Sequence, residues 1–301
     1  MRSTFLILFA AAFAVACVLT WATRWIALRC ELVSLPNPIV PQHTKPVAHL
    51  GGLGLAAGAA VVMFVAPMFS SFSPAMTVGS IPVGRLAVGG LAFLALGVVD
   101  DLLRLSAFVK LGLQVLSAAF AVTLGVQYQF TGLAPVDSLL SVGVIVLLVN
   151  SVNVTDVCDG LVIGIMLVTL SCWAWFEPTA TVVALVLAGA CLGFLLFNFP
   201  PASIFLGNTG SQFLGFALAA LLLASPHQHG WFLRPLQMVL FTGPFLFETF
   251  LLIRERRRKG LVWWRGSPDH FSLRLQASGL SRVQDRILRR WQFVVFCCRD
   301  M

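Results

Sequence analysis

Long apolar stretches separated by short polar ones are the feature that most constrains how this chain can fold. Each stretch approaches the roughly 20 residues that an α-helix needs to cross the hydrocarbon core of a bilayer. The stretches are continuously apolar and lack the alternation of a transmembrane strand, so helices fit them better than barrel strands. We therefore expect nine spans, near residues 4–23, 50–69, 84–100, 108–127, 138–152, 160–176, 179–197, 211–225 and 236–253.

The predicted fold class is all-α, a polytopic transmembrane helical bundle of nine to ten helices that forms a single integral membrane domain over residues 1–301. The tenth segment, Trp291–Cys298, is too short to span, and we expect it to lie in the interface or to form a truncated helix. Hydrophobic residues make up 58% of the chain and charged ones 11%, whereas a soluble domain carries about a quarter charged residues. This composition excludes a soluble enzyme and leaves no folded module to bind nucleic acid.

The basic residues predict which side of the membrane each loop faces. If the N-terminus lies outside, most of the 20 Lys and Arg fall on the inner loops, which is the positive-inside pattern. Small residues at 14–17 could mark a cleaved signal, but cleavage after the first span would place the basic run 254–259 outside. We therefore expect the first span to remain as an anchor. The net charge of +8 mostly reflects the inner loops, where it would attract anionic membrane lipid.

Nearly every unusual polar cluster falls on one of these inner loops, whereas the outer loops carry only apolar or weakly polar residues. Loops that share one face of the membrane can share one site, so we expect the active site on the cytoplasmic loops. The clusters are Asp100 and Asp101 after the third span, the set Asn150, Asn153, Asp156 and Asp159 after the fifth, Asn198 and Gly207–Ser211 after the seventh, and Asp269 and His270 in the last inner loop.

The carboxylates suggest a cation. An ionised Asp at a helix centre is unfavourable by about 2.5 to 3.5 kcal/mol on insertion scales, so Asp100 and Asp101 need a reason to be there. One reason is structural, an interfacial cap with an ion pair from Asp100 to Arg104. The polar stripe after the fifth span could likewise only satisfy neighbouring helices. Carboxylates gathered on two loops raise one another's pKa values unless a cation binds, and hard oxygen ligands suit Mg²⁺.

Three further segments carry groups that suit phosphate or sugar. Gly207–Ser211 places small residues at the start of the eighth span, where exposed backbone amides can bind an anion, although an ordinary helix start looks the same. Lys45 and His49 lie beside a glycine-rich helix entry whose glycines could serve packing alone. His270 is flanked by Asp269 and Arg274, which can orient an imidazole and bind phosphate oxygens, although a lone His is more often structural.

Together and in this order, these clusters resemble the polyprenyl-phosphate N-acetylhexosamine-1-phosphate transferases, which form glycosyltransferase family 4. The resemblance runs from about residue 36 to 280. Its most specific parts are Val99–Leu102, Asn153–Leu161 and Asn198–Ser211.

The resemblance implies that a polyprenyl (undecaprenyl) phosphate attacks the sugar-proximal phosphorus of a UDP-N-acetylhexosamine and releases UMP. It implies Mg²⁺, with Mn²⁺ as the alternative, a multi-pass protein of the bacterial inner (plasma) membrane, and the option of a homodimer. Glu248 matches an acidic position to which we assign no role. The implied site residues are Asp100, Asp101 and Asp156 for catalysis; Lys45, Asn153, Asp159, Asn198, Gly210, Ser211, His270 and Arg274 for the nucleotide-sugar or its phosphates; and Asp156 and Asn208 for the metal.

Two departures from the family pattern leave an alternative open. The family has an aspartate, a metal ligand, where this chain has Asn208, and its histidine-rich segment is reduced here to His270. The second departure points to a small N-acetylhexosamine, as in O-antigen or exopolysaccharide initiation. The first departure, Asn208, leaves open the alternative that the protein is a catalytically impaired family member that binds polyprenyl phosphate or a partner enzyme. A secondary transporter fits poorly, since the acids lie at one face and no internal repeat is evident.

Overall fold

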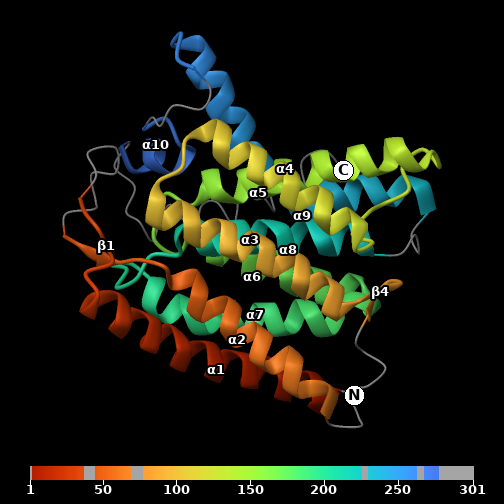
Figure 1. Cartoon of the computed structure of the whole chain (residues 1–301), viewed down its shortest axis with the longest axis horizontal. Helices are drawn as coiled ribbons and strands as arrows, with labels where there is room; N and C mark the ends of the chain where they lie inside the picture. The colour runs from red at the N-terminus through yellow and green to blue at the C-terminus, as the bar shows by residue number, and fades with distance from the viewer. Residues whose placement is uncertain (1, 37–44, 69–76, 226–229, 263–267, 278–301) are drawn as a thin grey trace.

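Helices make up nearly all of the regular structure. The computed structural model describes residues 2–36, 45–68, 77–225, 230–262 and 268–277 (Figure 1). Two antiparallel strand pairs join β1 (Val33–Ser34) to β2 (Val47–Ala48) and β3 (Thr77–Val78) to β4 (Ile81–Pro82). The helices are α1 (Arg2–Arg29), α2 (Gly51–Val65), α3 (Val83–Leu103), α4 (Ala107–Thr123), α5 (Ala134–Thr155), α6 (Leu161–Phe176), α7 (Thr181–Asn198), α8 (Gly207–Ala224), α9 (Gly230–Arg258) and α10 (Phe271–Ala277), with short 3₁₀ turns at Ala66–Met68 and Pro178–Ala180.

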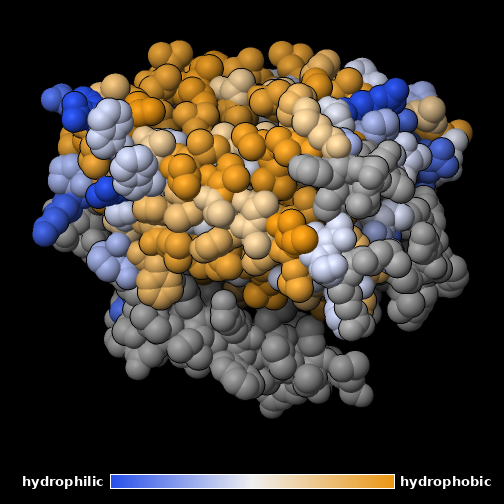
Figure 2. Space-filling model, turned by 90° about the horizontal axis from the view of Figure 1, so that it is seen from below, coloured by the Kyte–Doolittle hydropathy of each residue, from blue (hydrophilic) through white to orange (hydrophobic). Residues whose placement is uncertain are grey.

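The bundle has the dimensions and the surface of a membrane domain. Helices α1, α2, α3, α5, α7 and α8 are each long and apolar enough to cross a bilayer, and α4 and α6 are shorter apolar helices. Hydrophobic residues form a broad band over the middle of the face shown in Figure 2, and hydrophilic residues gather at its two ends. The predicted all-α polytopic bundle is therefore confirmed, and the chain is a multi-pass membrane protein.

Helix α8 lies inside the bundle, with α2, α3 and α5 packed around it. Glycines allow these contacts, because a Cβ on Gly52 would overlap the backbone of Gly210 and one on Gly97 would lie 2.5 Å from the carbonyl oxygen of Asn208. Backbone hydrogen bonds add to them, since the amide of Gly51 donates to the carbonyl oxygen of Phe205 at 2.9 Å. The beginnings of α2 and α8 and the end of α3 are thereby held together.

The helix ends that carry the polar clusters meet at one end of the bundle. Helices α3, α5 and α7 finish there and α2, α4, α6 and α8 begin there, as the hydrogen bonds described below require. We call this the site end; in Figure 1 it lies on the side of β1 and α10, away from the N-terminus.

The helices extend beyond several predicted boundaries at the site end. Helix α3 runs to Leu103 instead of residue 100, α5 runs to Thr155 instead of 152, and α8 begins at Gly207 instead of 211. Polar residues that a hydropathy pattern assigns to loops are helical here because they bond across the bundle. The segment Trp291–Cys298, predicted as a tenth element, lies outside the described residues.

Candidate active site

Asp101, in the last turn of α3, binds the beginning of α8. Its carboxylate accepts the backbone amides of Asn208 and Thr209, both at 2.9 Å, and the Thr209 hydroxyl at 2.6 Å. His49 Nε2 lies 3.1 Å from the same carboxylate, whose side chain has no exposed surface. Gly207, with φ of +74°, permits this approach, since a Cβ there would lie 2.7 Å from Asp101 Oδ2. The anion bound at this helix N-terminus is therefore the protein's own carboxylate.

Asp100 faces the other way and pairs with Lys110 on α4. Lys110 Nζ lies 2.7 Å from Asp100 Oδ2, and the backbone amide of Leu105 donates to Asp100 Oδ1 at 3.1 Å. Arg104, which the sequence offered as a partner at i, i+4, instead ends the helix in the left-handed region with φ of 52°. The structure thus gives Asp100 a cation from another helix, because the chain turns immediately after α3.

Lys110 also joins α5 and α8. Its ammonium donates to Asn153 Oδ1 at 3.0 Å and to Asn208 Oδ1 at 2.7 Å. The Asn153 amide nitrogen in turn donates to Asn208 Oδ1 at 2.7 Å and to the Ser211 hydroxyl at 2.8 Å. Asp100, Asn153, Asn208 and Ser211 therefore form one network, as their shared side of the membrane predicted.

Asp156 is a carboxylate at the site end that takes no part in this hydrogen-bond network. It caps the end of α5 and is partly exposed, and its side chain makes no hydrogen bond or ion pair with any residue that the structure describes. Burial at the site, together with the negative charges of Asp101 and Asp159, raises the pKa of Asp156 to about 7, although His49 opposes the shift. A carboxylate in such a position favours a proton or a cation beside it.

Asn198 and Asp159 hold the neighbouring loops in place. The Asn198 side chain accepts the Gly160 amide at 2.9 Å and donates to the carbonyl oxygen of Ile204 at 3.0 Å. Asp159 Oδ2 accepts the amide of Ala202 at 3.1 Å. Both residues tie the loop between α5 and α6 to the loop between α7 and α8 through hydrogen bonds with the backbone.

Of three further predicted site residues, Gly210 and Ser211 are buried and Lys45 is exposed. Gly210 packs against Gly52, and Ser211 is fully buried against Asn153, so both lie inside the helix packing. Lys45 is exposed just before β2 and makes no hydrogen bond or ion pair within the described part of the chain. Of these three, Lys45 alone presents a polar group to solvent.

His270 belongs to a second cluster at the start of α10. Its Nδ1 lies 3.2 Å from Glu248 Oε1 on α9, and the same oxygen accepts the amide of Phe271 at 3.0 Å. Arg274 lies 3.6 Å from Glu255, and Asp269 pairs with Lys259. Helix α10 approaches the neighbourhood of Asp156 where the Gln276 amide contacts Cys158 Sγ at 3.6 Å.

The donor atoms at the site fit a metal ion at Asp156 and do not fit one at Asn208. Among the described residues, no group of three or more His, Cys, Asp or Glu side chains could hold a metal by itself. Mg²⁺ usually keeps several waters and binds one or two carboxylates together with substrate phosphates, which Asp156 can satisfy. The oxygen of Asn208 already accepts Lys110 and Asn153, which leaves it no lone pair for a cation.

Two residues, Lys110 and Glu248, have central contacts in the structure although no role was predicted for them from the sequence pattern. Lys110 lies in the first turn of α4, where a lone cation between apolar neighbours is a signal for a buried partner. Glu248 had no assigned role, and the structure makes it the residue that positions His270. His49, a weak candidate in the sequence, is bound to Asp101.

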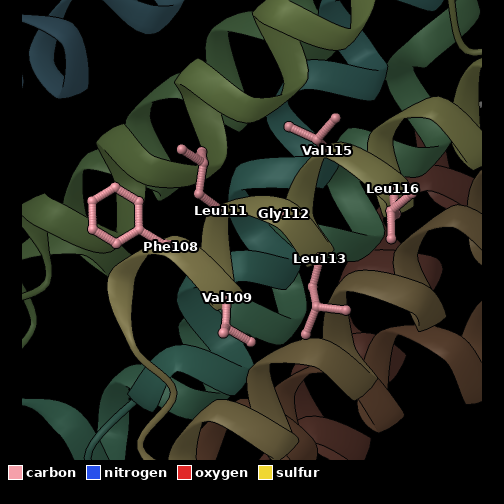
Figure 3. Close-up of a pocket in the computed structure, with 7 residues that line it drawn as sticks. All are labelled: Phe108, Val109, Leu111, Gly112, Leu113, Val115 and Leu116. Atoms are coloured by element: carbon pink, nitrogen blue, oxygen red, sulfur yellow. The ribbon is translucent and has the colours of Figure 1, made fainter.

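An apolar groove of about 650 Å³ runs along α4. Figure 3 shows its lining side chains, all from this helix, including Phe108, Val109, Leu113 and Leu116. Phe108 and Leu116 are both about two thirds exposed, at 68% and 66%. The groove therefore opens on the face that a membrane's hydrocarbon would cover.

The chain is similar to one known protein family and to several named transferases. Residues 83–225, which include most of the network, match the model of glycosyl transferase family 4. The chain is 32% identical over 229 residues to a decaprenyl-phosphate N-acetylglucosaminephosphotransferase of Mycobacterium tuberculosis (strain CDC 1551 / Oshkosh), covering 67% of this chain and 55% of that protein. It is 28% identical over 281 residues to a probable undecaprenyl-phosphate N-acetylglucosaminyl 1-phosphate transferase of Bacillus subtilis (strain 168), covering 88% and 75%.

A third relative is the phospho-N-acetylmuramoyl-pentapeptide-transferase of Clostridioides difficile (strain 630). The identity is 30% over 203 residues, which cover 58% of this chain and 62% of that protein. The chain thus spans little more than half the length of the mycobacterial relative that it matches.

Proposed function

We propose, since the chain belongs to glycosyl transferase family 4, that it transfers an N-acetylhexosamine-1-phosphate from a UDP-sugar to a polyprenyl phosphate. An oxygen of the acceptor phosphate would attack the sugar-linked phosphorus. The bond from that phosphorus to the bridging oxygen would break, UMP would leave with the bridging oxygen, and the sugar would remain on a polyprenyl diphosphate. The observation that carries the proposal is the meeting of Asp100, Lys110 and Asp156 at one end of a membrane bundle.

Asp156 would hold the divalent cation, Mg²⁺ or Mn²⁺. When bound, the cation would neutralise the diphosphate and stabilise the charge that develops on the leaving phosphate. Asp156 is suited to this role because it is partly exposed and because the charges of Asp101 and Asp159 act on it. Asp101 would not bind the cation directly in this scheme, because its oxygens already accept hydrogen bonds from His49, Asn208 and Thr209.

Asp100 and Lys110 would orient the acceptor phosphate. The apolar chain of the acceptor would lie in lipid along the groove of α4, whose first lining residue, Phe108, is two positions from Lys110. A phosphate at the head of that chain would then replace an amide oxygen of Asn153 or Asn208 at the ammonium of Lys110, and Asp100 would hold that ammonium in place. This arrangement keeps the hydrocarbon in the membrane and brings only the phosphate to the site.

The donor would reach the site from the cytoplasm of a bacterium, with the protein in the inner membrane. The site end carries α10 and the basic end of α9, which the positive-inside rule assigns to the cytoplasm. A single histidine, His270, held by Glu248, would contact the sugar or the diphosphate, which favours a small N-acetylhexosamine. A role in O-antigen or exopolysaccharide synthesis and assembly as a homodimer remain predictions of the family resemblance.

The test is release of UMP by purified protein in nanodiscs with undecaprenyl phosphate, Mg²⁺ and a panel of UDP-N-acetylhexosamines. We expect release with at least one donor, and loss of release in Asp100→Ala and Asp156→Ala. Asp137→Asn is the matched control, because Asp137 caps a loop before α5, at the opposite end, through Thr131 and Gly132. Absence of release with every donor would reject the activity.

A catalytically impaired protein that binds polyprenyl phosphate is the second candidate, and Asn208 favours it. This amide stands where the family resemblance places a metal-binding aspartate. If wild type binds undecaprenyl phosphate but releases no UMP, and Asn208→Asp gains Mg²⁺-dependent release, the binding protein is the correct assignment. An active wild type eliminates it.

A further inference from the structure

The ammonium of Lys110 lies in a cage of oxygen atoms. Asp100 Oδ2 at 2.7 Å, Asn153 Oδ1 at 3.0 Å and Asn208 Oδ1 at 2.7 Å come from α3, α5 and α8, while Lys110 itself comes from α4. An ammonium has three donors, and these three oxygens use all of them. The Lys110 side chain is 16% exposed and that of Asp100 6%. Oxygens converging from separate helices are what a protein offers to a cation, and here the cation is a side chain.

The orientation of the Asn208 amide follows from its neighbours. Its nitrogen donates to Asp101 Oδ1 at 2.9 Å, and its oxygen accepts both Lys110 and Asn153. Turning the amide over would place its oxygen against the Asp101 carboxylate and its nitrogen against two N–H donors. The hydrogen-bond partners of the Asn208 amide therefore permit only one orientation of its nitrogen and oxygen.

A carboxylate at position 208 could not make these contacts unaided. It would hold an oxygen close to Asp101 Oδ1, where the Asn208 nitrogen now lies at 2.9 Å, and two carboxylate oxygens at that distance need a proton or a metal ion between them. The amide supplies an N–H instead. Asn208 thus satisfies Asp101 on one side and Lys110 on the other without any added cation.

We propose that Lys110 and Asn208 replace a divalent-cation position, so that the Lys110 ammonium is the resident cation between Asp100, Asn153 and Asn208, and a metal ion binds through Asp156 alone. Asn208 is then a positioning residue for Lys110 and not a metal ligand. This inference rests on the proposed function for its catalytic consequence, but its binding prediction stands without it.

Mn²⁺ binding followed by electron paramagnetic resonance, with the metal alone and full-length protein in nanodiscs, tests the proposal. We expect Asn208→Ala to change the Mn²⁺ dissociation constant by less than twofold, because no ligand is lost. Asp156→Asn should weaken binding at least tenfold, and Asn208→Asp should strengthen it at least tenfold by pairing a second carboxylate with Asp101. Asn150→Ala is the matched control, since Asn150 bonds to Gln114 and does not touch Lys110.

A tenfold or greater weakening of Mn²⁺ binding in Asn208→Ala would overturn the proposal, because it would make the amide oxygen a ligand. Lys110→Met gives an independent arm: losing the resident ammonium leaves Asp100 uncompensated, so we expect Mn²⁺ to bind more tightly. Unchanged or weaker binding in a folded Lys110→Met protein would also count against it. Thermal unfolding identifies any variant that fails to fold, and Asn208→Ala keeps the question decidable in that case.

Turnover separates this inference from the proposed function. In an active protein, Asn208→Ala should lower kcat while leaving KM for the UDP-sugar and the Mg²⁺ concentration for half-maximal rate within twofold of wild type. If Asn208 had only a structural role, Asn208→Ala would lower the stability of the protein without lowering kcat selectively relative to KM. A shifted Mg²⁺ requirement would contradict the inference, whereas a wild type without turnover would reject the proposed function and leave the Mn²⁺ result to decide this one.

Discussion

Asp101 and Asp156 lie at the same end of the same bundle, yet their surroundings are opposite. Asp101 has no exposed side-chain surface and accepts hydrogen bonds from Asn208 and Thr209 beside His49. Asp156 is partly exposed and makes no hydrogen bond within the described chain. The comparison separates two uses of one side chain: an enclosed, saturated carboxylate holds helices together, and an open one remains available for chemistry.

The difference arises from where each residue falls on its helix. Asp101 is in the last turn of α3, which packs against the first turn of α8, so backbone amides with no partner in their own helix point at it. Asp156 caps α5 at the point where the chain leaves the bundle toward α6. Asp101 therefore lies against the end of another helix, whereas Asp156 lies where the chain turns toward α6.

The largest expected effect is on turnover at Asp156. Asp156→Asn should lower the rate of UMP release by about 10³-fold, as expected for loss of one electrostatic group at a reacting phosphate. The variant should still fold, because no hydrogen bond is removed. A rate within tenfold of wild type would show that the open carboxylate is not part of the site.

At Asp101 the expected loss is of stability. Asp101→Ala should lower the free energy of unfolding by about 3–5 kcal/mol, because buried donors of Asn208 and Thr209 and the His49 ring lose their partner. Thermal unfolding in detergent measures this. Asp159→Ala, which removes a partly exposed carboxylate that accepts the Ala202 amide, serves as the control and should lose less. Equal losses would erase the distinction between enclosed and open carboxylates.

The pH dependence of stability should reveal the cost of leaving Asp156 open. Its pKa of about 7 in the folded protein lies above the ordinary value of 3.8 for an aspartate, so the folded state binds the extra proton and loses stability as pH rises between these values. Without divalent cation, Asp156→Asn should therefore be more stable than wild type at pH 8, on the order of 1–2 kcal/mol after solvent screening. The gain should shrink toward pH 4 and disappear when wild type is loaded with Mn²⁺.

The smallest effect is expected at His49. Burial alone would lower its pKa, but the hydrogen bond and charge of Asp101 outweigh burial and raise it above 6.5. The ion pair is therefore fully present below pH 6.5 and is lost as pH rises through the higher folded-state pKa. His49→Gln should cost about 1 kcal/mol at pH 6 and less at pH 9, by thermal unfolding. A gap that widens with pH would mean that His49 binds Asp101 as a neutral ring.

The sequence by itself determined the membrane bundle, the approximate positions of its helices and the gathering of polar residues at one end. Span length and charge asymmetry are local properties, which is why α2, α6 and α7 begin or end within a few residues of the expected positions. Asp100, Asn153 and Asn208 were likewise grouped correctly, because alternate loops of an antiparallel bundle share one face.

Only the tertiary structure decided which of these residues are bound to one another. That Asp101 occupies the N-terminus of α8, that Gly210 serves packing and that Lys110 pairs with Asp100 depend on how four helices rotate and approach. Hydropathy does not encode that rotation. It is set by close contacts such as Gly52 against Gly210, where absence of a side chain on both helices allows the distances on which the site depends.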